Sequence, residues 1–233
     1  MWASAKSWYA IRTRTIKLGK GPGFHRRDLL TTGIALAALP FGLQLSSPVA
    51  AATDNVRSKT VDRVEAYLNT IKTLSARFLQ VDNAGNVVHG QLYMRRPGRL
   101  RFEYDAPSPL LLVADGTWLI LHDKELGQVN RFPLYETPMG VLVDDPVNLR
   151  DKVEVIEAEE DLGIVRIKLV DREVPDEGWL GITFTEPPMM LRQWRIKDAQ
   201  GGITALSLTD IRINRKLDPK LFVFLDPEPF SEN

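Results

Sequence analysis

The sequence predicts an α+β protein in which one N-terminal helix precedes a barrel or strongly curved antiparallel β-sheet. One stretch, Asp54 to Leu74, has apolar residues spaced three or four apart with charges between them, which is the helical pattern. The rest of the chain consists of short apolar or alternating runs, separated by turn signals at intervals of roughly 8–12 residues. With 233 residues and 44% hydrophobic content, the chain is long enough for a substantial core.

Residues 1–52 have the features of a signal peptide. The first 27 residues contain seven Lys and Arg residues and no acidic residue. An apolar run, Leu29 to Leu45, and a small-residue segment, Ser46 to Ala52, follow. The apolar run contains Gly33 and Pro40 and is short for a membrane span of about 20 residues, so a transmembrane anchor is the less favoured alternative.

The pair Arg26-Arg27, followed by Asp28 and two leucines, resembles a twin-arginine export signal. The long basic region and the mild apolar region favour this route, and an ordinary general-secretion signal is the alternative. Both routes take the mature chain out of the cytoplasm of a bacterium, so we expect a periplasmic protein.

The mature part, residues 53–233, is expected to be a single domain and a monomer. Removal of the leader leaves about 180 residues with a net charge of about −6, which argues against a nucleic-acid partner. The chain has no cysteine. This excludes disulfides, thiolate catalysis, Cys-based zinc sites and the acylated cysteine of a lipoprotein anchor.

Thr53 or Asp54 can cap the start of the helix. Twelve strands and one interruption of the strand pattern are expected after it. The segment Pro133 to Asp145 interrupts the strand pattern and predicts a short helix or irregular lid, which begins near Thr137 with Pro138 at its first position. The expected strands are Ser75 to Asp82, Val87 to Arg95, Arg99 to Tyr104, Pro109 to Ala114, Thr117 to His122, Gln128 to Phe132, Val153 to Ala158, Ile164 to Val170, Trp179 to Thr185, Met189 to Lys197, Ile203 to Ile213 and Leu221 to Leu225.

No catalytic constellation is found. The mature part contains two histidines, His89 and His122, both beside turns or strand ends. The sequence has no G-x-S-x-G elbow, no H-E-x-x-H pair, no P-loop and no G-x-G-x-x-G opening a helix. We therefore expect no enzyme activity, no catalytic residues, no metal site and no cofactor.

The hairpin from Gly90 to Tyr104 combines an apolar face with a cluster of four arginines, Arg95, Arg96, Arg99 and Arg101. These arginines are either a solvated hairpin tip or guanidinium groups that donate hydrogen bonds to carbonyls of a lid. The apolar faces of the strands either fill the core or enclose a ligand, as barrels of about eight or more strands can do. Methionines such as Met139 suit an adaptable wall, but composition does not decide between the two interpretations.

The ordered set of segments resembles the LolA family of periplasmic outer-membrane lipoprotein carriers. Ala76 to Gln80 (ARFLQ) is similar to the family's F-x-Q signature, and Gly90 to Tyr104 (GQLYMRRPGRLRFEY) looks like its hairpin with an Arg-Pro pair. The likeness spans nearly the whole mature chain and continues in Pro107, Val113 to Leu119 (VADGTWL), Gln128-Val129 and Phe222 to Phe224 before Pro227.

This resemblance implies a half-open antiparallel β-barrel of about ten or eleven strands, with the N-terminal helix and a short lid helix over an apolar cavity. It implies a carrier whose partners are the acyl chains of lipoproteins, an inner-membrane ABC-type lipoprotein release complex and an outer-membrane acceptor. Arg96 would be the lid latch, the residue that holds the lid closed. The residues expected to line the cavity are Leu92, Met94, Leu100, Phe102, Tyr104, Trp118, Ile120, Met139, Phe184 and Trp194.

Two alternatives share the same half-barrel. One is a periplasmic sensor or regulator that binds lipids or mislocalised lipoproteins, and the other is a carrier of a non-protein lipid. A single domain without a second module fits a shuttle better than a sensor.

Overall fold

The computed structural model describes residues 48–227, with side chains from residue 55 onward. The predicted signal peptide, residues 1–52, lies outside this range except for its last five residues, which belong to the first helix. No helix in the described part is both long and apolar enough to cross a membrane.

The N-terminal helix α1 (Pro48–Thr70) packs one apolar stripe against the sheet. Val61, Val64 and Leu68 on this stripe are at most 4% exposed, which agrees with the helical spacing in the sequence. The helix ends four residues before the expected Leu74 because Asn214 caps it. The side-chain nitrogen of Asn214 donates to the Thr70 carbonyl (2.9 Å), and its side-chain oxygen accepts from the Lys72 main-chain amide (2.8 Å). The chain then enters the first strand.

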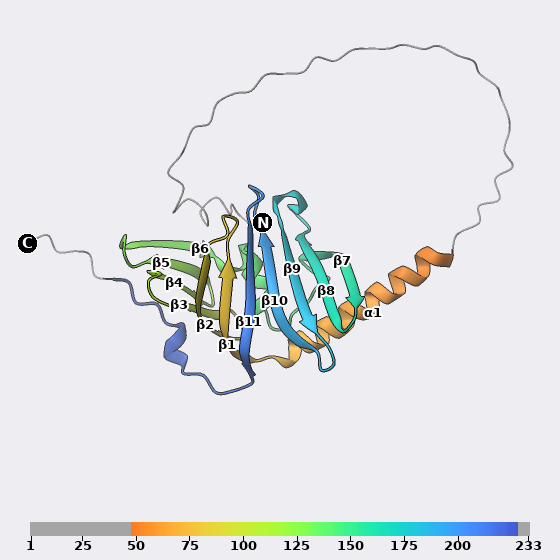
Figure 1. Ribbon diagram of the computed structural model, residues 1–233, viewed down its shortest axis with the longest axis horizontal. Helices are drawn as coiled ribbons and strands as arrows, with labels where there is room; N and C mark the ends of the chain where they lie inside the picture. Colours follow the sequence, from red (N-terminus) through yellow and green to blue (C-terminus); the bar gives the residue numbers. More distant parts are fainter. Residues whose placement is uncertain (1–47, 228–233) are drawn as a thin grey trace, which may run out of the picture.

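Eleven antiparallel strands form one curved sheet (Figure 1). Their bounds are β1 (Thr73–Val81), β2 (Val87–Arg95), β3 (Arg99–Tyr104), β4 (Leu110–Asp115), β5 (Trp118–Asp123), β6 (Gln128–Pro133), β7 (Val153–Asp161), β8 (Ile164–Asp171), β9 (Trp179–Thr185), β10 (Met190–Lys197) and β11 (Ile203–Ile213).

The sheet order is β6-β5-β4-β3-β2-β1-β11-β10-β9-β8-β7, so β1 and β11 pair in the middle and β6 and β7 are the two edges. The 3-10 helix η2 (Leu134–Glu136) and the short helix α2 (Pro138–Val143) follow β6. Together with residues 144–150 they connect the two edges, and we call residues 134–150 the lid. The predicted half-open barrel with an N-terminal helix and a short lid helix is confirmed.

The core fills the concave face of the sheet. An aromatic cluster lies where β1, β2 and β3 pair: the ring of Phe78 packs edge-on against Phe102 (5.3 Å between centroids) and Tyr104 (5.2 Å). Gly90 on β2 makes this possible, because a Cβ at that position would lie 2.5 Å from the Phe78 ring and 2.2 Å from the Glu103 carbonyl oxygen. The glycine at the start of the hairpin is therefore required by packing.

The C-terminal segment crosses the convex face of the sheet. The expected strand Leu221 to Leu225 is wrong: the chain instead forms a 3-10 helix, η4 (Pro219–Phe222), followed by an irregular tail. The Asp218 carboxylate accepts a hydrogen bond from the Lys220 amide (2.9 Å), and Pro219 starts the turn, which favours a helical turn over a strand. Helix η4 packs against β3 and β4 on the outside of the sheet (Figure 1).

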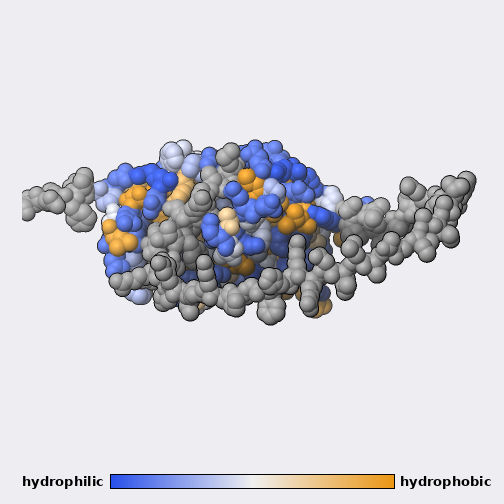
Figure 2. Space-filling model, turned by 90° about the horizontal axis from the view of Figure 1, so that it is seen from above, coloured by the Kyte–Doolittle hydropathy of each residue, from blue (hydrophilic) through white to orange (hydrophobic). Residues whose placement is uncertain are grey.

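The molecular surface is mainly hydrophilic in the view from above, and apolar residues form separate patches on it (Figure 2). Scattered exposed apolar residues are normal for a folded protein.

Candidate functional site

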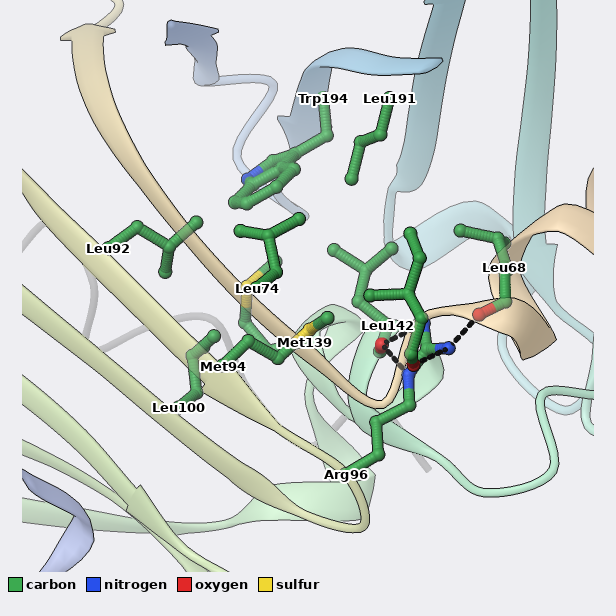
Figure 3. Close-up of a pocket in the computed structure, with 11 residues that line it drawn as sticks. Leu68, Leu74, Leu92, Met94, Arg96, Leu100, Met139, Leu142, Leu191 and Trp194 are labelled. Carbon is green, nitrogen blue, oxygen red and sulfur yellow. Dashed lines mark hydrogen bonds between the residues drawn. The ribbon is translucent and has the colours of Figure 1, made fainter. Parts of the chain in front are cut away.

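An apolar pocket lies between the concave face of the sheet, the end of α1 and the lid helix α2 (Figure 3). Its volume is about 10 Å³, room for about one water molecule, so the structure is closed. The lining residues come from α1, β1–β3, α2, β10 and the turns beside them: Leu68, Ile71, Leu74, Leu92, Met94, Arg96, Leu100, Met139, Leu142, Leu191 and Trp194.

The β2–β3 hairpin supplies one wall through strict alternation. Leu92 and Met94 occupy every second position of β2, so their side chains share the concave face, and Arg96 continues the series just beyond the strand. Met94 lies opposite Leu100 of β3 and Leu74 of β1, which extends the apolar wall over three strands.

Arg96 reaches from this wall to the ends of both helices (Figure 3). Its Nε and Nη2 donate to the Leu142 carbonyl of α2 at 3.0 and 2.7 Å. Its Nη1 donates to the carbonyls of Leu68 in α1 and of Ile71 just after it, the latter at 3.0 Å. The side chain of Arg96 therefore connects the hairpin, the N-terminal helix and the lid.

The acceptors of Arg96 explain how a buried cation is tolerated. The residue is only 7% exposed, and carbonyls at the C-terminal end of a helix have no intrahelical partner and carry partial negative charge. Burial lowers the pKa of Arg96 to about 10, against the opposing effect of the nearby carboxylates of Asp145 and Asp144. The guanidinium is therefore charged at neutral pH.

Main-chain hydrogen bonds support the same junction. The Arg96 amide donates to the Lys72 carbonyl (2.9 Å), and the Gly98 amide donates to the Val143 carbonyl at the end of α2 (2.8 Å). Gly98 has a φ of +72°, and a Cβ there would lie 2.9 Å from the Gly116 Cα, so a glycine is required at this turn. The tip of the hairpin is thus in direct contact with the lid.

The rest of the lid is fastened to α1 by polar contacts. The Asn69 side chain donates to the Val147 carbonyl (3.0 Å) and accepts from its amide (2.8 Å). The Glu65 carboxylate accepts from the Leu149 amide (2.8 Å), and Lys72 forms an ion pair with Asp145 (2.8 Å). The C-terminal part of α1 and Lys72 just after it are therefore joined to residues 145–149.

Tyr67 makes a further contact between α1 and the sheet. Its hydroxyl accepts a hydrogen bond from the Leu191 amide (3.0 Å), at a place where the β9–β10 register is irregular. Its ring packs edge-on against Phe184 at 5.8 Å between centroids, and burial raises the pKa of the hydroxyl. The hydroxyl thus satisfies an amide at the irregularity in the strand.

The structure brings together most of the residues that the sequence suggested. Leu92, Met94, Leu100, Met139 and Trp194 line the pocket with Arg96. Phe102 lies behind Trp194, 6.3 Å between ring centroids, and Tyr104 lies further along the same face, where it donates to the Gln80 side chain (3.0 Å). Phe184 is fully buried against Tyr67 and does not line the pocket.

Trp118 and Ile120 are placed elsewhere. They alternate with Leu119 and Leu121 along β5, and it is Leu119 and Leu121 that join the concave core. Trp118 and Ile120 therefore point to the convex face, and Trp118 is 41% exposed. The sequence showed several consecutive apolar residues here, which gave no alternation from which to assign a face.

Sequence reasoning missed the lining residues of α1 and its continuation, Leu68, Ile71 and Leu74, as well as Leu142 and Leu191. The helical stripe would have identified Leu68, because the same stripe must face the sheet. The remaining lining is apolar apart from Arg96, so the site offers a surface for hydrocarbon. In the described part of the chain, no three His, Cys, Asp or Glu side chains are grouped so as to hold a metal ion.

Comparison with known proteins finds related sequences. The family model "Outer membrane lipoprotein carrier protein LolA" matches residues 69–225. An outer-membrane lipoprotein carrier protein of Halorhodospira halophila is 29% identical over 187 residues, 76% of this chain and 86% of the relative. That of Chromohalobacter salexigens is 26% identical over 200 residues, 82% of this chain and 93% of the relative.

A protein of Rickettsia prowazekii without an assigned function is 28% identical over 187 residues, 80% of this chain and 85% of the relative. Among solved structures, a LolA superfamily protein of Nitrosomonas europaea matches with a TM-score of 0.41 and 12% identity, over 70% of this chain and 97% of that chain. The match of the family model to residues 69–225 confirms the resemblance seen in the sequence, and the chain belongs to the LolA family of outer-membrane lipoprotein carrier proteins.

Proposed function

We propose that this chain is a periplasmic, non-enzymatic carrier of lipoproteins. It binds the acyl chains of lipoproteins released from the inner membrane by an ABC-type complex and delivers them to an acceptor at the outer membrane. The observation that carries this proposal is the apolar pocket closed by the charged side chain of Arg96, in a chain of the lipoprotein carrier family.

The free energy of hydrating acyl chains creates the need for such a carrier. Each CH₂ group exposed to water costs about 0.8 kcal/mol, so a lipoprotein with three long chains would face a cost on the order of tens of kcal/mol. The pocket lining provides hydrocarbon contacts on several elements, including Leu92, Met94 and Trp194. These contacts would replace water around the chains.

The closed pocket must open before it can take an acyl chain. Its volume of about 10 Å³ accommodates no lipid, so the lid has to move away from the hairpin. Such movement breaks the hydrogen bonds from Arg96 to Leu142. A bond of this charge-assisted kind contributes on the order of 1.5–3 kcal/mol, and the cost of opening is subtracted from the binding free energy. A carrier whose affinity for cargo is reduced in this way can release the cargo.

Substitution of Arg96 tests the proposal. In Arg96→Leu the closed state loses its bonds to the lid, and we expect affinity for a fluorescent acyl probe to rise by about a hundredfold. We also expect transfer of a bound lipoprotein to acceptor membranes to fall. Arg95→Leu is the matched control, because Arg95 lies on the same hairpin and contacts Phe222 on the outer face. An Arg96→Leu protein that transfers lipoprotein at the wild-type rate contradicts the role of Arg96.

The identity of the cargo can be measured directly. Mass spectrometry of material that co-purifies with the periplasmic protein is expected to find acylated proteins. A non-protein lipid in their place would contradict the proposed cargo and favour a lipid carrier on the same fold. Retention of lipoproteins without transfer to acceptor membranes would favour a sensor.

We further propose that residues 1–52 direct export and are removed, and that the export route is the twin-arginine one. Arg26 and Arg27 are the residues that motivate this route. Replacement of both by lysine is expected to abolish accumulation in the periplasm, measured by cell fractionation. Undiminished export of the double variant would instead indicate the general secretion route.

A further inference from the structure

A second pocket lies on the other side of the lid helix. This side pocket has a volume of about 430 Å³ and is lined by three parts of the chain: residues 135–144, residues 148–153, and the end of β8 with the two residues that follow it. Its size falls in the range of small-ligand sites, roughly 300–1,000 Å³. It lies where the lid connects the two edges of the sheet.

Helix α2 is the wall between the two pockets. Met139 and Leu142 of this helix line the apolar pocket, whereas Gly140 and Val141 line the side pocket. The wall is one short helix of six residues, and Arg96 and Gly98 hold its C-terminal end. Displacement of α2 would therefore join an apolar space to a polar one.

The side pocket has the chemistry of a polar ligand site. Charged groups of both signs line it, including Asp151, Lys152 and Arg172. The Arg172 guanidinium is held in place by the Val153 carbonyl (2.9 Å), and the Lys152 ammonium lies 5.4 Å from the centroid of the Tyr135 ring. Burial of an acyl chain against such groups is unfavourable, whereas peptide N–H and C=O groups can hydrogen-bond to them.

We infer that the side pocket receives the polypeptide segment next to the acylated residue of the cargo. This inference rests on the proposed function. An acylated protein brings hydrocarbon and polypeptide from one residue, and the two pockets on either side of α2 offer each part a matching surface. Opening of the lid would admit the acyl chains on one side of α2 while the polypeptide leaves through the other.

The charge of the side pocket adds a preference. Four carboxylates (Asp144, Asp151, Asp171 and Glu173) and two cations (Lys152 and Arg172) line it. The exposed carboxylate of Asp151 favours a segment with basic residues over one with acidic residues. Because most of these groups are accessible to solvent, each added charge changes affinity modestly and the effect is screened by salt.

The test uses three probes with the same acyl chain. They are an N-palmitoyl peptide with two lysines after its first residue, the same peptide with two glutamates, and palmitoylethanolamide, which has no peptide. Each is titrated below its micelle concentration, and the fluorescence of Trp194 and the other tryptophans is followed. We expect the lysine peptide to bind about three- to tenfold more tightly than the glutamate peptide at low salt.

Two variants localise the effect. Asp151→Lys in the side pocket is expected to reduce the ratio between the two peptides, whereas Asp161→Lys, at the far end of β7, is expected to leave it unchanged. Palmitoylethanolamide should bind equally to wild type and both variants. Equal binding of the two peptides to wild type, or equal changes in the two variants, would overturn the inference and leave the carrier function intact. Failure of all three probes to bind would contradict the proposed function itself.

Discussion

The two faces of the β2–β3 hairpin use arginine to hold different segments of the chain. On the concave face, the buried Arg96 donates to carbonyls of α1 and the lid. On the convex face, the guanidinium of Arg95 lies 5.2 Å from the centroid of the Phe222 ring, and Arg101 donates to the Leu221 carbonyl (3.1 Å). Both faces therefore fasten a helical turn to the sheet.

The two attachments differ in what stabilises them. The C-terminal segment is anchored by burial of Phe222, which is only 1% exposed. The two hairpin arginines that contact this segment, Arg95 and Arg101, are partly accessible to solvent. The lid is held by polar bonds from a cation in an apolar pocket. When Arg96 is removed, opening of the lid can return its carbonyl acceptors to water, whereas loss of a buried aromatic ring leaves a cavity in the folded protein. The outer attachment should therefore control stability, and the inner one should control binding.

The largest expected effect on stability comes from Phe222→Ala. The change removes a buried ring, so we expect the free energy of unfolding to fall by about 3 kcal/mol, measured by urea denaturation. Affinity for an acyl probe should stay close to wild type, because Phe222 lies outside the sheet. Phe224→Ala, in the less buried part of the tail, is the matched control with a smaller loss. A change in acyl affinity as large as that of Arg96→Leu would remove the distinction between the two faces.

A smaller effect, a change in acyl affinity, is expected from Tyr67→Phe, in the part of α1 that packs on the concave side of the sheet. The variant leaves the Leu191 amide without its acceptor in the closed state, at a cost of about 1–3 kcal/mol. If α1 moves away from β10 during opening, the closed state loses stability relative to the open one, and acyl affinity should rise about tenfold. The measurement is a probe titration, together with acrylamide quenching of Trp194, which is buried in the closed pocket.

Tyr93→Phe is the control for this variant, because Tyr93 lies on β2 between the concave residues Leu92 and Met94 and points to the other face. An unchanged affinity in Tyr67→Phe would show that α1 stays on β10 while the lid opens. The lid movement would then be confined to residues 134–150.

The sequence was sufficient to predict the hairpin and its concave face, but it did not identify the groups that bind Arg96. Alternation around Leu92, Met94 and Leu100 predicted the concave face, and the Arg-Pro turn placed Arg96 at its end. The acceptors of Arg96 are backbone carbonyls, which carry no residue-type signal. Tyr67 was missed for a similar reason, since its partner is an amide exposed by an irregularity in β10.

The errors arose where the local pattern was ambiguous. Consecutive apolar residues in β5 hid the orientation of Trp118 and Ile120, which the pairing register assigns to the convex face. In the C-terminal segment, alternating Phe222 and Phe224 suggested a strand, but the cap at Asp218 and the packing on β3 and β4 produce a 3-10 helix. Long-range packing decided both cases, and short-range periodicity cannot report it.

The smallest expected effect is that of pH on the hydrogen bonds between Arg96 and the lid. Burial lowers the pKa of Arg96 to about 10, so the group is charged in both the native and the unfolded chain below that pH. As pH rises past 10, the native protein releases this proton first. The unfolded chain then binds more protons, so the contribution of Arg96 to stability rises with pH only in that alkaline range.

The ratio of acyl affinities between Arg96→Leu and wild type should therefore be constant from pH 5 to pH 9. Probe titrations of both proteins at pH 5, 7 and 9 measure it. A ratio that falls toward pH 5 would show that a carboxylate controls the lid, and Asp144 and Asp145, which act on the charge of Arg96, would be the groups to substitute. A constant ratio would leave the hydrogen bonds of Arg96 as the pH-independent part of lid closure, which suits a carrier whose release must depend on its acceptor.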